Sequence, residues 1–365
     1  MIEPEPLQLV GQTEVRFQHR TLLYFSGCDF FRLARRTQLA AAAQTVLHKN
    51  GLSTSASRMT TGNHELYEKL EADLAIFFGT ESAVLLPDGY LAGMAVTQAL
   101  AGEFTHAFVD ELAHGALRDA ARMLDCPVKL FKHRDAADLA RAIIKCSVDA
   151  RPLVLTDGMF GHDGSVAPLR EHLKILPRNG MILVDDAYGA GVLGKTGQGT
   201  LEHAGVNRQQ IIQCATLSKA FGAYGGVVLA THALRKKILT RSRIFIGTTP
   251  LPLPLAGAAL AALKILRAQP RRRKKLFRNV HFVRTHLRAA GWEIAETPGP
   301  IIRLPVMSDK HELTLNKRLL AAGIYPPYLR YGNSPHGAFR FVISNAHQPS
   351  HLETLCAVLA DFKRD

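Results

Sequence analysis

Long apolar runs are missing from this chain of 365 residues. No window of 18 or more residues is continuously apolar, and the most apolar stretch, residues 250–266, is interrupted by prolines and by a lysine. A membrane-spanning helix needs about 20 consecutive apolar residues, so this stretch is interpreted as a buried helix. With 47% hydrophobic residues, the chain can bury a sizeable core. We therefore expect a globular protein without a membrane span.

Paired cysteines are also missing. The five cysteines are scattered and none belongs to a CxxC pair, so neither a disulfide framework nor a metal site is expected. The first ten residues, MIEPEPLQLV, are acidic and contain prolines, unlike a signal peptide. We expect a cytoplasmic protein with reduced thiols. No internal repeat or low-complexity segment is present.

Basic residues exceed acidic ones, 45 to 31, giving a net charge of +14. This excess favours anionic partners such as nucleotides, phosphates or an acidic carrier protein. The densest basic run, residues 270–288, carries apolar residues at helical spacing, which favours a helix with a solvated basic face. Docking of a phosphate-bearing thioester carrier is an alternative. Nucleic acid is less favoured because the run lacks zinc-finger spacing and any RNA-binding signature.

Short β-branched segments alternate with amphipathic ones over the middle of the chain. This rhythm predicts an α/β fold, a mostly parallel sheet with helices on both faces and a ligand site beyond the carboxyl ends of the strands. We expect a large domain over 45–248, an N-terminal segment over 1–44 and a smaller α+β domain over 249–365. The predicted strands cover 82–87, 106–110, 128–131, 152–158, 181–186, 211–217 and 225–230. In the smaller domain the pattern predicts a long helical region over 255–290 and a strand-like segment at 292–296.

Two of these strands end in residues that can carry chemistry. VDDAYGAGVLG places Asp185 and Asp186 at a strand end, and ATLSKAFGAYGG places Lys219 between a strand and a glycine cluster. Alone, the aspartates could cap a turn and the lysine could lie on the surface. Together they indicate an acid and an amine in one cleft. An aldehyde cofactor needs this pair, because a lysine forms the Schiff base and an aspartate keeps a pyridine nitrogen protonated.

An ordered set of motifs extends over nearly the whole chain. They are LYFSGCDFFRLA, SRMTTG, YEKLEADLAIFFG, LLPDGYLAG, DELAHGAL, TDGMFGHDGSVAPL, VDDAYGAGVLG, TLSKAFGAYGG and AFRFVISNAH. In this order they resemble the α-oxoamine synthases, a family of fold-type I pyridoxal phosphate enzymes in the class I/II aminotransferase superfamily. That family includes 8-amino-7-oxononanoate synthase and glycine C-acetyltransferase. The resemblance implies a large domain with a mostly parallel sheet and a smaller α+β C-terminal domain.

The resemblance also implies roles for individual residues. Lys219 would bind pyridoxal phosphate covalently, Asp185 would face its pyridine nitrogen and His114 would stack on its ring. Gly89 and Tyr90 fall where the family's backbone amides meet the phosphate, and Thr216 matches a phosphate-binding hydroxyl. Asp88 departs from the small residue usual before them, so we expect its carboxylate to be turned away.

Further positions concern the subunit partner and the substrate. GTT at 247–249 resembles the segment that reaches the neighbouring subunit's phosphate, so the resemblance implies a homodimer with Thr248 or Thr249 acting in trans. An ordinary turn is the alternative for both threonines. Arg340 matches the arginine that receives the substrate carboxylate, a role suited to a planar guanidinium. A surface ion pair is its alternative.

Several positions depart from the family pattern. Tyr188 replaces a histidine that usually contacts the cofactor's phenolic oxygen, and a tyrosine hydroxyl can still donate there. Gly161 replaces a serine, and Gly93 and Cys28 each replace an asparagine. The family's proline-rich segment is altered at 331–337, and its other arginine is Ala338. Drift without consequence and a changed substrate are both compatible with these substitutions.

The resemblance implies a biosynthetic pyridoxal phosphate-dependent acyltransferase. It would condense a small amino acid with an acyl thioester, carried on coenzyme A or on an acyl carrier protein, and release carbon dioxide. A pyridoxal phosphate-dependent aminotransferase is the alternative within the same cofactor class. A third hypothesis is a non-catalytic partner of an active paralogue, against which the presence of Lys219, Asp185, His114 and Arg340 argues.

Overall fold

The computed structural model describes residues 6–330 and 337–364, which divide by their contacts into two compact units. This division differs from the boundaries expected at 44 and 248. Helices α1 (Thr37–Asn50) and α2 (Glu65–Phe78) pack against α10 (Leu253–Ala268), which joins all three to the larger unit. The larger unit comprises 33–160 and 166–269, and the smaller unit contains the described residues of 1–32, 161–165 and 270–365.

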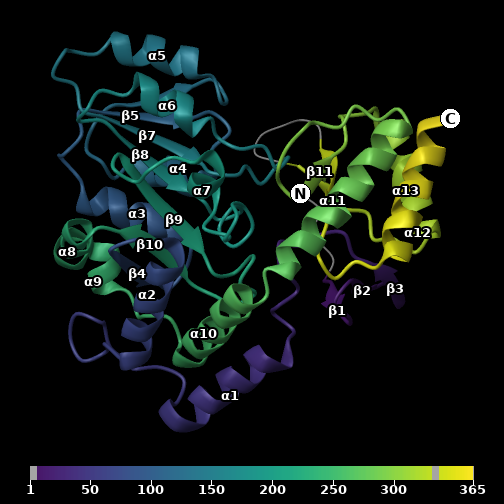
Figure 1. Ribbon diagram of the computed structural model, residues 1–365, viewed down its shortest axis with the longest axis horizontal. Coiled ribbons are helices and arrows are strands. Elements are labelled where there is room, and N and C mark those ends of the chain that lie inside the picture. The colour runs from purple at the N-terminus through teal and green to yellow at the C-terminus, as the bar shows by residue number, and fades with distance from the viewer. Residues whose placement is uncertain (1–5, 331–336, 365) are drawn as a thin grey trace. The chain divides into compact units, whose positions relative to one another are not determined.

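A seven-stranded sheet forms the centre of the larger unit (Figure 1), in the order β4-β10-β9-β8-β7-β5-β6. Strand β10 runs antiparallel to both of its neighbours, and the other neighbouring pairs are parallel. The predicted mostly parallel α/β sheet is therefore confirmed. Its strands are β4 (Ser82–Leu86), β5 (His106–Asp110), β6 (Val128–Phe131), β7 (Pro152–Asp157), β8 (Met181–Asp185), β9 (Ile211–Thr216) and β10 (Gly226–Ala230).

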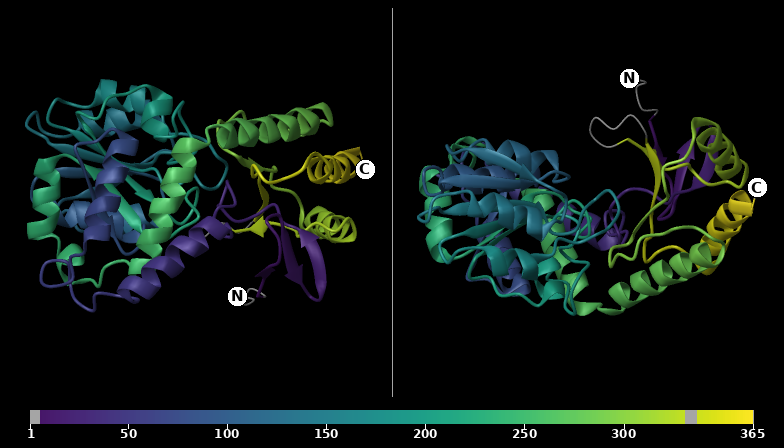
Figure 2. Two further views of the ribbon diagram at one scale, coloured as in Figure 1. Left: turned by 60° about the horizontal axis from the view of Figure 1, so that its bottom comes forward. Right: turned by 90° about the horizontal axis from the view of Figure 1, so that it is seen from above.

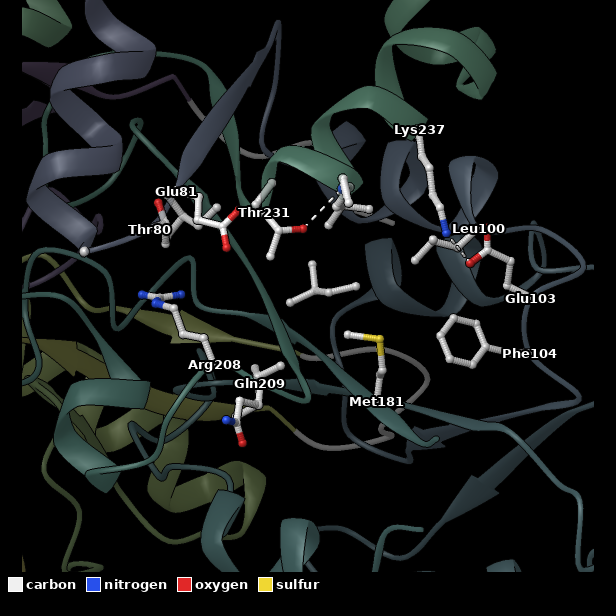
Figure 3. A pocket seen from close by; sticks show the side chains of 17 residues that line it. Thr80, Glu81, Leu100, Glu103, Phe104, Met181, Arg208, Gln209, Thr231 and Lys237 are labelled. Carbon is white, nitrogen blue, oxygen red and sulfur yellow. Dashed lines mark hydrogen bonds and ion pairs between the residues drawn. The ribbon is translucent and has the colours of Figure 1, made fainter. Parts of the chain in front are cut away.

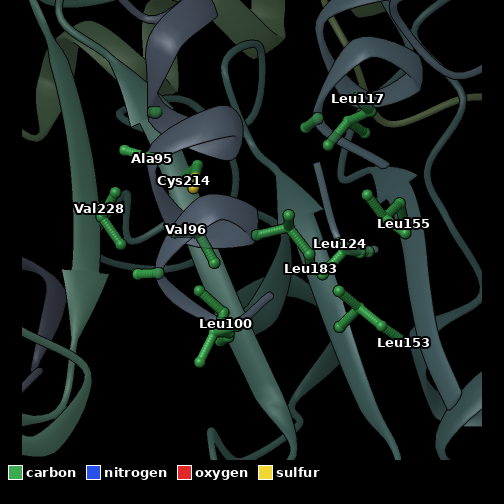
Figure 4. Close-up of a cluster of buried hydrophobic side chains, with 14 of the residues drawn as sticks. Ala95, Val96, Leu100, Leu117, Leu124, Leu153, Leu155, Leu183, Cys214 and Val228 are labelled. Atoms are coloured by element: carbon green, nitrogen blue, oxygen red, sulfur yellow. The ribbon is translucent and has the colours of Figure 1, made fainter. Parts of the chain in front are cut away.

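Both faces of this sheet are covered, which explains why the central strands are nearly continuous runs of apolar residues. On one face Val96 and Leu100 pack with Leu183 and Cys214 of the strands (Figure 4). On the other face a second cluster includes Phe160, Val184 and Leu201. The remaining helices of this unit are α3 (Tyr90–Ala99), α4 (Gly115–Ala121), α5 (Ala136–Ile144), α6 (Leu169–Ile175), α7 (Thr200–Ala204), α8 (His232–Arg241) and α9 (Arg243–Gly247).

The smaller unit contains two three-stranded sheets, β1-β2-β3 and β11-β13-β12. Its helices α11 and α13 pack side by side and α12 contacts α13, as the green and yellow helices in Figure 2 show. The elements are β1 (Gln8–Leu9), β2 (Glu14–Phe17), β3 (Arg20–Leu23), α11 (Arg271–Ala289), β11 (Ile301–Arg303), α12 (Asp309–Ala321), β12 (Tyr328–Leu329), β13 (Ala338–Val342) and α13 (Pro349–Arg364).

Two local predictions differ from the structure. The helical region expected over 255–290 is two helices, because the first ends before Pro270 and the second begins after it. The strand-like segment 292–296 is an irregular stretch, in which Trp292 and Ile294 are buried and the Trp292 Nε1 donates to the Leu359 carbonyl of α13 (2.9 Å). Its alternating pattern reflects burial against a helix, without pairing in a sheet.

Candidate active site

The chemistry-bearing residues of the larger unit meet beyond the carboxyl ends of the parallel strands. Asp157 ends β7, Asp185 ends β8, and Lys219 follows β9 by three residues. A cavity of about 160 Å³ lies here. This is the edge at which open α/β sheets bind ligands. The cavity is lined by Asp88, Gly89, Tyr90, His114, Ala116, Asp157, Asp185, Ala187, Tyr188, Thr216, Ser218 and Lys219.

Lys219 lies against the face of an aromatic ring. Its Nζ is 3.5 Å from the centroid of the Tyr188 ring, which is a cation–π contact. Both side chains line the cavity and both are half-buried. Tyr188, the departure from a histidine, therefore contacts the lysine through its ring face. The contact restricts where the amine can move within the cavity.

The side chains of the adjacent aspartates Asp185 and Asp186 lie in different surroundings. Asp185 lines the cavity, and its Oδ1 accepts the backbone N–H of Ala187 (3.0 Å). Asp186 is buried among donors: its carboxylate accepts the Thr200 hydroxyl (2.5 Å) and the Gln213 amide (2.5 Å). Burial raises the pKa of Asp186 to about 7. The structure thus places the predicted member of the pair, Asp185, in the cavity, whereas hydrogen bonds hold the Asp186 carboxylate in the interior of the fold.

A second carboxyl in the cavity, Asp157, was missed in the sequence. It pairs in register with Asp185 on the neighbouring parallel strand, and its side chain is buried. Its Oδ2 accepts the backbone N–H of His114 (2.8 Å). Burial and then the neighbouring Asp185 charge raise the pKa of Asp157 well above its ordinary value. Its only signal in the sequence was an aspartate ending a strand, TD at 156–157, which became meaningful once the strand order was known.

His114 is held at the start of α4. Its Nδ1 accepts the backbone N–H of Ala116 (3.2 Å), so the imidazole acts as the N-cap of that helix. Its backbone N–H is fixed by Asp157. The ring also meets the Tyr90 ring edge to face, with centroids 6.0 Å apart. These contacts set the orientation of an exposed imidazole at the cavity.

The amino terminus of α3 forms one wall of the cavity. Gly89 precedes the helix, and a Cβ at this position would lie 2.7 Å from the Thr216 Cβ, so only glycine fits without a shift. The Thr216 hydroxyl lies 2.8 Å from the Ser218 hydroxyl. Backbone N–H groups at a helix start together with two hydroxyls form a cradle suited to a phosphate. Ser218 was not singled out in the sequence.

Asp88 lies in this cradle, contrary to the expectation that it is turned away. It lines the cavity, and its Oδ1 accepts the backbone N–H of Tyr90 (2.7 Å). The Tyr224 hydroxyl also hydrogen-bonds Asp88, which raises the pKa of Tyr224. The carboxylate is drawn in because the first N–H groups of a helix lack partners within the helix.

Arg340 belongs to the smaller unit and is almost completely buried on β13. Its Nε donates to the Gly161 carbonyl (2.5 Å), and its Nη2 lies 3.7 Å from the Cys28 Sγ. Two of the positions that depart from the family pattern therefore contact this arginine. Ala338, where the family has its other arginine, begins the same strand, and residues 331–336 of the altered segment lie outside the described residues.

Two other predicted positions lie away from the cavity lining. Thr248 is the C-cap residue that follows α9, and its hydroxyl donates to the Ile244 carbonyl (2.6 Å). Gly93 faces the core between α3 and α4, and a Cβ there would meet the Ala120 Cβ at an ordinary 3.6 Å. Thr249 is likewise not among the lining residues that the structure describes. The cavity is therefore built from Lys219 and its neighbours on the strand ends, without Thr248 of the same chain.

These residues fit pyridoxal phosphate. Lys219 can bond to its aldehyde carbon, Asp185 supplies a carboxylate for a protonated pyridine nitrogen and His114 supplies a flat ring. The Thr216 and Ser218 hydroxyls beside the α3 terminus suit its phosphate, and the Asp88 carboxylate holds the Tyr90 N–H of that terminus. The fit rests on the glycine that Thr216 requires at position 89 and on the donor set gathered in one cavity. Among the described residues, no group of three or more His, Cys, Asp or Glu side chains is arranged to hold a metal ion.

Comparisons with known proteins identify the family of the chain. The family model "Aminotransferase class I and II" matches residues 30–359. A putative 8-amino-7-oxononanoate synthase of Desulforudis audaxviator is 35% identical over 95% of this chain and 91% of the relative. An 8-amino-7-oxononanoate synthase of Thioalkalivibrio sulfidiphilus is 34% identical over 93% of this chain and 88% of the relative. The solved serine palmitoyltransferase of Sphingomonas wittichii superposes with a TM-score of 0.92 at 25% identity, covering 98% of this chain and 91% of that one.

The chain belongs to the class I/II aminotransferase family of fold-type I pyridoxal phosphate enzymes, and within it to the α-oxoamine synthases. It is a pyridoxal phosphate-dependent acyltransferase that catalyses a decarboxylative condensation of an amino acid with an acyl thioester. No helix in the described part of the chain has the length and apolar character needed to span a bilayer.

Proposed function

We propose that Lys219, Asp185, His114 and Arg340 carry the condensation of a small amino acid with an acyl thioester to an α-aminoketone. The observation that supports this most directly is the convergence of Lys219, Asp185 and the α3 amino terminus on one cavity. When bound, pyridoxal phosphate supplies an electron-withdrawing ring that stabilises negative charge at the amino acid's α-carbon. The roles below concern the chain's own residues.

Lys219 is proposed as both the covalent anchor and the base. With the cofactor and the amino acid bound, its Nζ would take the α-proton of the amino acid and would later return a proton to the product. The Tyr188 ring, 3.5 Å from this Nζ, keeps the amine in the cavity through both steps.

Asp185 and His114 are proposed to hold the ring from its edge and its face. The Asp185 carboxylate keeps the pyridine nitrogen protonated, because an opposite charge favours the charged form. Its own position is fixed by the Ala187 N–H. The His114 imidazole, oriented by its N-cap bond to Ala116, provides the stacking surface. The two residues thereby strengthen the electron withdrawal on which the reaction depends.

Arg340 is proposed to receive the substrate carboxylate. Arg340 is buried, and its guanidinium is held in a fixed plane by the Gly161 carbonyl, a geometry that suits recognition of a planar carboxylate. Cys28, in contact with Nη2, takes the place of the family's asparagine, so this chain offers a weaker polar partner beside the carboxylate. We propose that these two positions tune the preference for the amino acid.

We further propose a cytoplasmic homodimer in which Thr248 or Thr249 of each subunit reaches the phosphate in the partner's site. The location of Thr248 outside its own chain's cavity lining is consistent with a role in trans. Coenzyme A and acyl carrier protein are the two proposed carriers of the acyl thioester. The excess of basic residues favours either anionic carrier.

The function is tested by product analysis with the enzyme loaded with pyridoxal phosphate. Glycine, alanine and serine labelled at the carboxyl carbon are each incubated with an acyl-coenzyme A or an acyl carrier protein, and free thiol and labelled carbon dioxide are measured. The proposal expects both products in equal amounts, only when both substrates are present. Transfer of the amino group to a keto acid without thiol release would support an aminotransferase instead.

A further inference from the structure

A second cavity, of about 380 Å³, lies at the amino-terminal ends of the parallel strands, opposite to the cavity that contains Lys219. Met181 and Ile211, the first residues of β8 and β9, line it. The cavity that contains Lys219 is lined by the last residues of the same two strands, Asp185 and Thr216. The two cavities are therefore separated by the length of the sheet. Its volume falls in the range of about 300–1,000 Å³ that is usual for small-molecule sites.

The interior of the second cavity is apolar. Leu100, Phe104 and Met181 lie between charged groups on either side in Figure 3. Ile212 and Leu234, both buried, complete this surface. Such a lining offers a hydrocarbon chain a surface from which water is excluded, at a gain of about 0.8 kcal/mol for each buried methylene.

One wall carries a cation with an unused donor. The Arg208 Nη2 donates to the Phe78 carbonyl (3.0 Å), whereas its Nη1 is buried and has no hydrogen-bond partner among the described residues. Burial lowers the pKa of Arg208 to about 10, so the group remains charged at neutral pH. Asp186 is the neighbouring carboxylate that acts on this charge, and it makes no hydrogen bond with Arg208 among the described residues. Because Arg208 also lines the cavity, its charge favours an anionic ligand there.

The other charges of the lining already have partners. Glu103 forms ion pairs with Lys237 (2.6 Å) and Arg241 (2.9 Å), on the side of the cavity away from Arg208 in Figure 3. Glu81 accepts the His232 N–H (2.9 Å) at the start of α8. With these two carboxylates in the lining, a singly charged ligand is favoured over a doubly charged phosphate. A carboxylate also matches the planar guanidinium.

We propose that this cavity is a second ligand site, which binds a medium-chain aliphatic carboxylate. Its carboxylate meets Arg208, and its hydrocarbon chain lies against Met181, Ile212 and Leu234. The site lies apart from the acyl-transfer chemistry at Lys219 and adds a binding function to it. Occupation of the site stabilises the native larger unit, because the ligand binds the folded state alone.

The test is calorimetric titration of octanoate into the enzyme saturated with pyridoxal phosphate. Octanol and octyl phosphate serve as comparison ligands for the missing and the doubled charge. We expect octanoate to bind more tightly than both, and R208Q to weaken octanoate by about tenfold or more while leaving octanol unchanged. R178Q, which removes an exposed arginine of the same unit, is the matched control and keeps wild-type affinity.

A second variant keeps the proposal testable if R208Q folds poorly. Ala233 is exposed and lines the cavity, so A233F adds bulk to the cavity without disturbing the core. We expect A233F to abolish octanoate binding and to leave the visible absorption band of the bound cofactor unchanged. Equal octanoate affinity in wild type, R208Q and A233F would overturn the proposal. So would octanoate that competes with pyridoxal phosphate, because it would then bind at Lys219.

Discussion

Asp157 is a residue of the site that was not predicted from the sequence. It places a second carboxyl beside Asp185, in register on the adjacent strand. Two like charges in a buried cavity cannot both ionise freely, so one of the pair holds its proton to a higher pH. The raised pKa of Asp157 identifies it as that member. Asp185 is the other member of the pair, and it is the one that we propose faces the cofactor.

The D157N variant tests this assignment. The folded pKa of Asp157 lies above its unfolded value, so the folded state keeps a proton that the unfolded state has lost, and stability falls as pH rises above about 4. We expect D157N to match wild type near pH 4 and to unfold at higher urea concentration than wild type at pH 8. D149N, at an exposed position, is the control and should follow wild type throughout. A pH dependence unchanged in D157N would contradict the assignment.

His172 is a titratable group outside the site. Its ring is buried against Phe131, with no hydrogen-bond partner for either nitrogen among the described residues. Burial lowers the pKa of His172 to about 4. A lowered folded pKa means that its contribution is present above about pH 6.5 and is lost as the pH falls toward 4.

We expect H172L to flatten the acid side of the stability profile. The leucine cannot be protonated in the unfolded state, so up to about 3 kcal/mol of acid destabilisation is removed between pH 6.5 and 4. Urea unfolding at pH 4.5 and 7.5 measures this difference. H203L, at an exposed histidine, should leave the difference between the two pH values as in wild type. If H172L also keeps the wild-type difference in stability between pH 4.5 and 7.5, His172 is solvated in the folded protein.

At the scale of elements, the junction between β4 and α3 provides the anion cradle. Substitutions of Gly89, before the helix, and of Gly93, within it, are expected to have opposite effects. A Cβ at residue 89 would lie 2.7 Å from the Thr216 side chain, whereas a Cβ at residue 93 would make only ordinary contacts of 3.6 Å. G89A should therefore push the helix terminus away from Thr216. G93A should instead stabilise α3 by about 0.5–1 kcal/mol, since alanine is the better helix former.

We expect G89A to weaken pyridoxal phosphate binding by about tenfold or more, and G93A to leave it unchanged. Titration of the cofactor, followed by absorbance, measures both affinities, and thermal unfolding confirms that each variant is folded. Equal affinities in wild type and G89A would show that the phosphate is bound elsewhere.

The sequence predicted the elements that are determined locally. The strands of the central sheet are apolar runs, and most begin or end at glycine, proline or aspartate, so their positions could be predicted within one or two residues. Segment 292–296 was misread because alternation alone cannot show whether a partner strand exists. Asp157 and Ser218 were missed for a related reason. Their place in the cavity follows from strand order and from the path of the chain after β9, which no single segment contains.

At the scale of the whole molecule, the proposed homodimer makes a distinctive prediction. If Thr248 and Thr249 act in the partner's site, K219A and T248A/T249A are defective for different reasons. In a mixed dimer one site carries both defects, and the other has an intact lysine and intact threonines. Random mixing should therefore restore roughly a quarter of the wild-type sites.

This complementation is measured by unfolding and refolding the two variants together and assaying thiol release. Mixed dimers are identified by differently tagged subunits, and refolded wild type gives the reference activity. Mixed dimers without activity, formed from variants that each refold, would place the two threonines in their own subunit's structure and would refute the shared site.

The central claim is that Lys219 binds pyridoxal phosphate in the cavity at the strand ends. Absorbance spectra of wild type, K219A and K129A with the cofactor test it most directly, since Lys129 lies exposed on β6. The account predicts a visible band in wild type and K129A that is absent in K219A, and that changes when a small amino acid is added. A band of equal strength in K219A, or no band in the wild-type protein, would contradict the account.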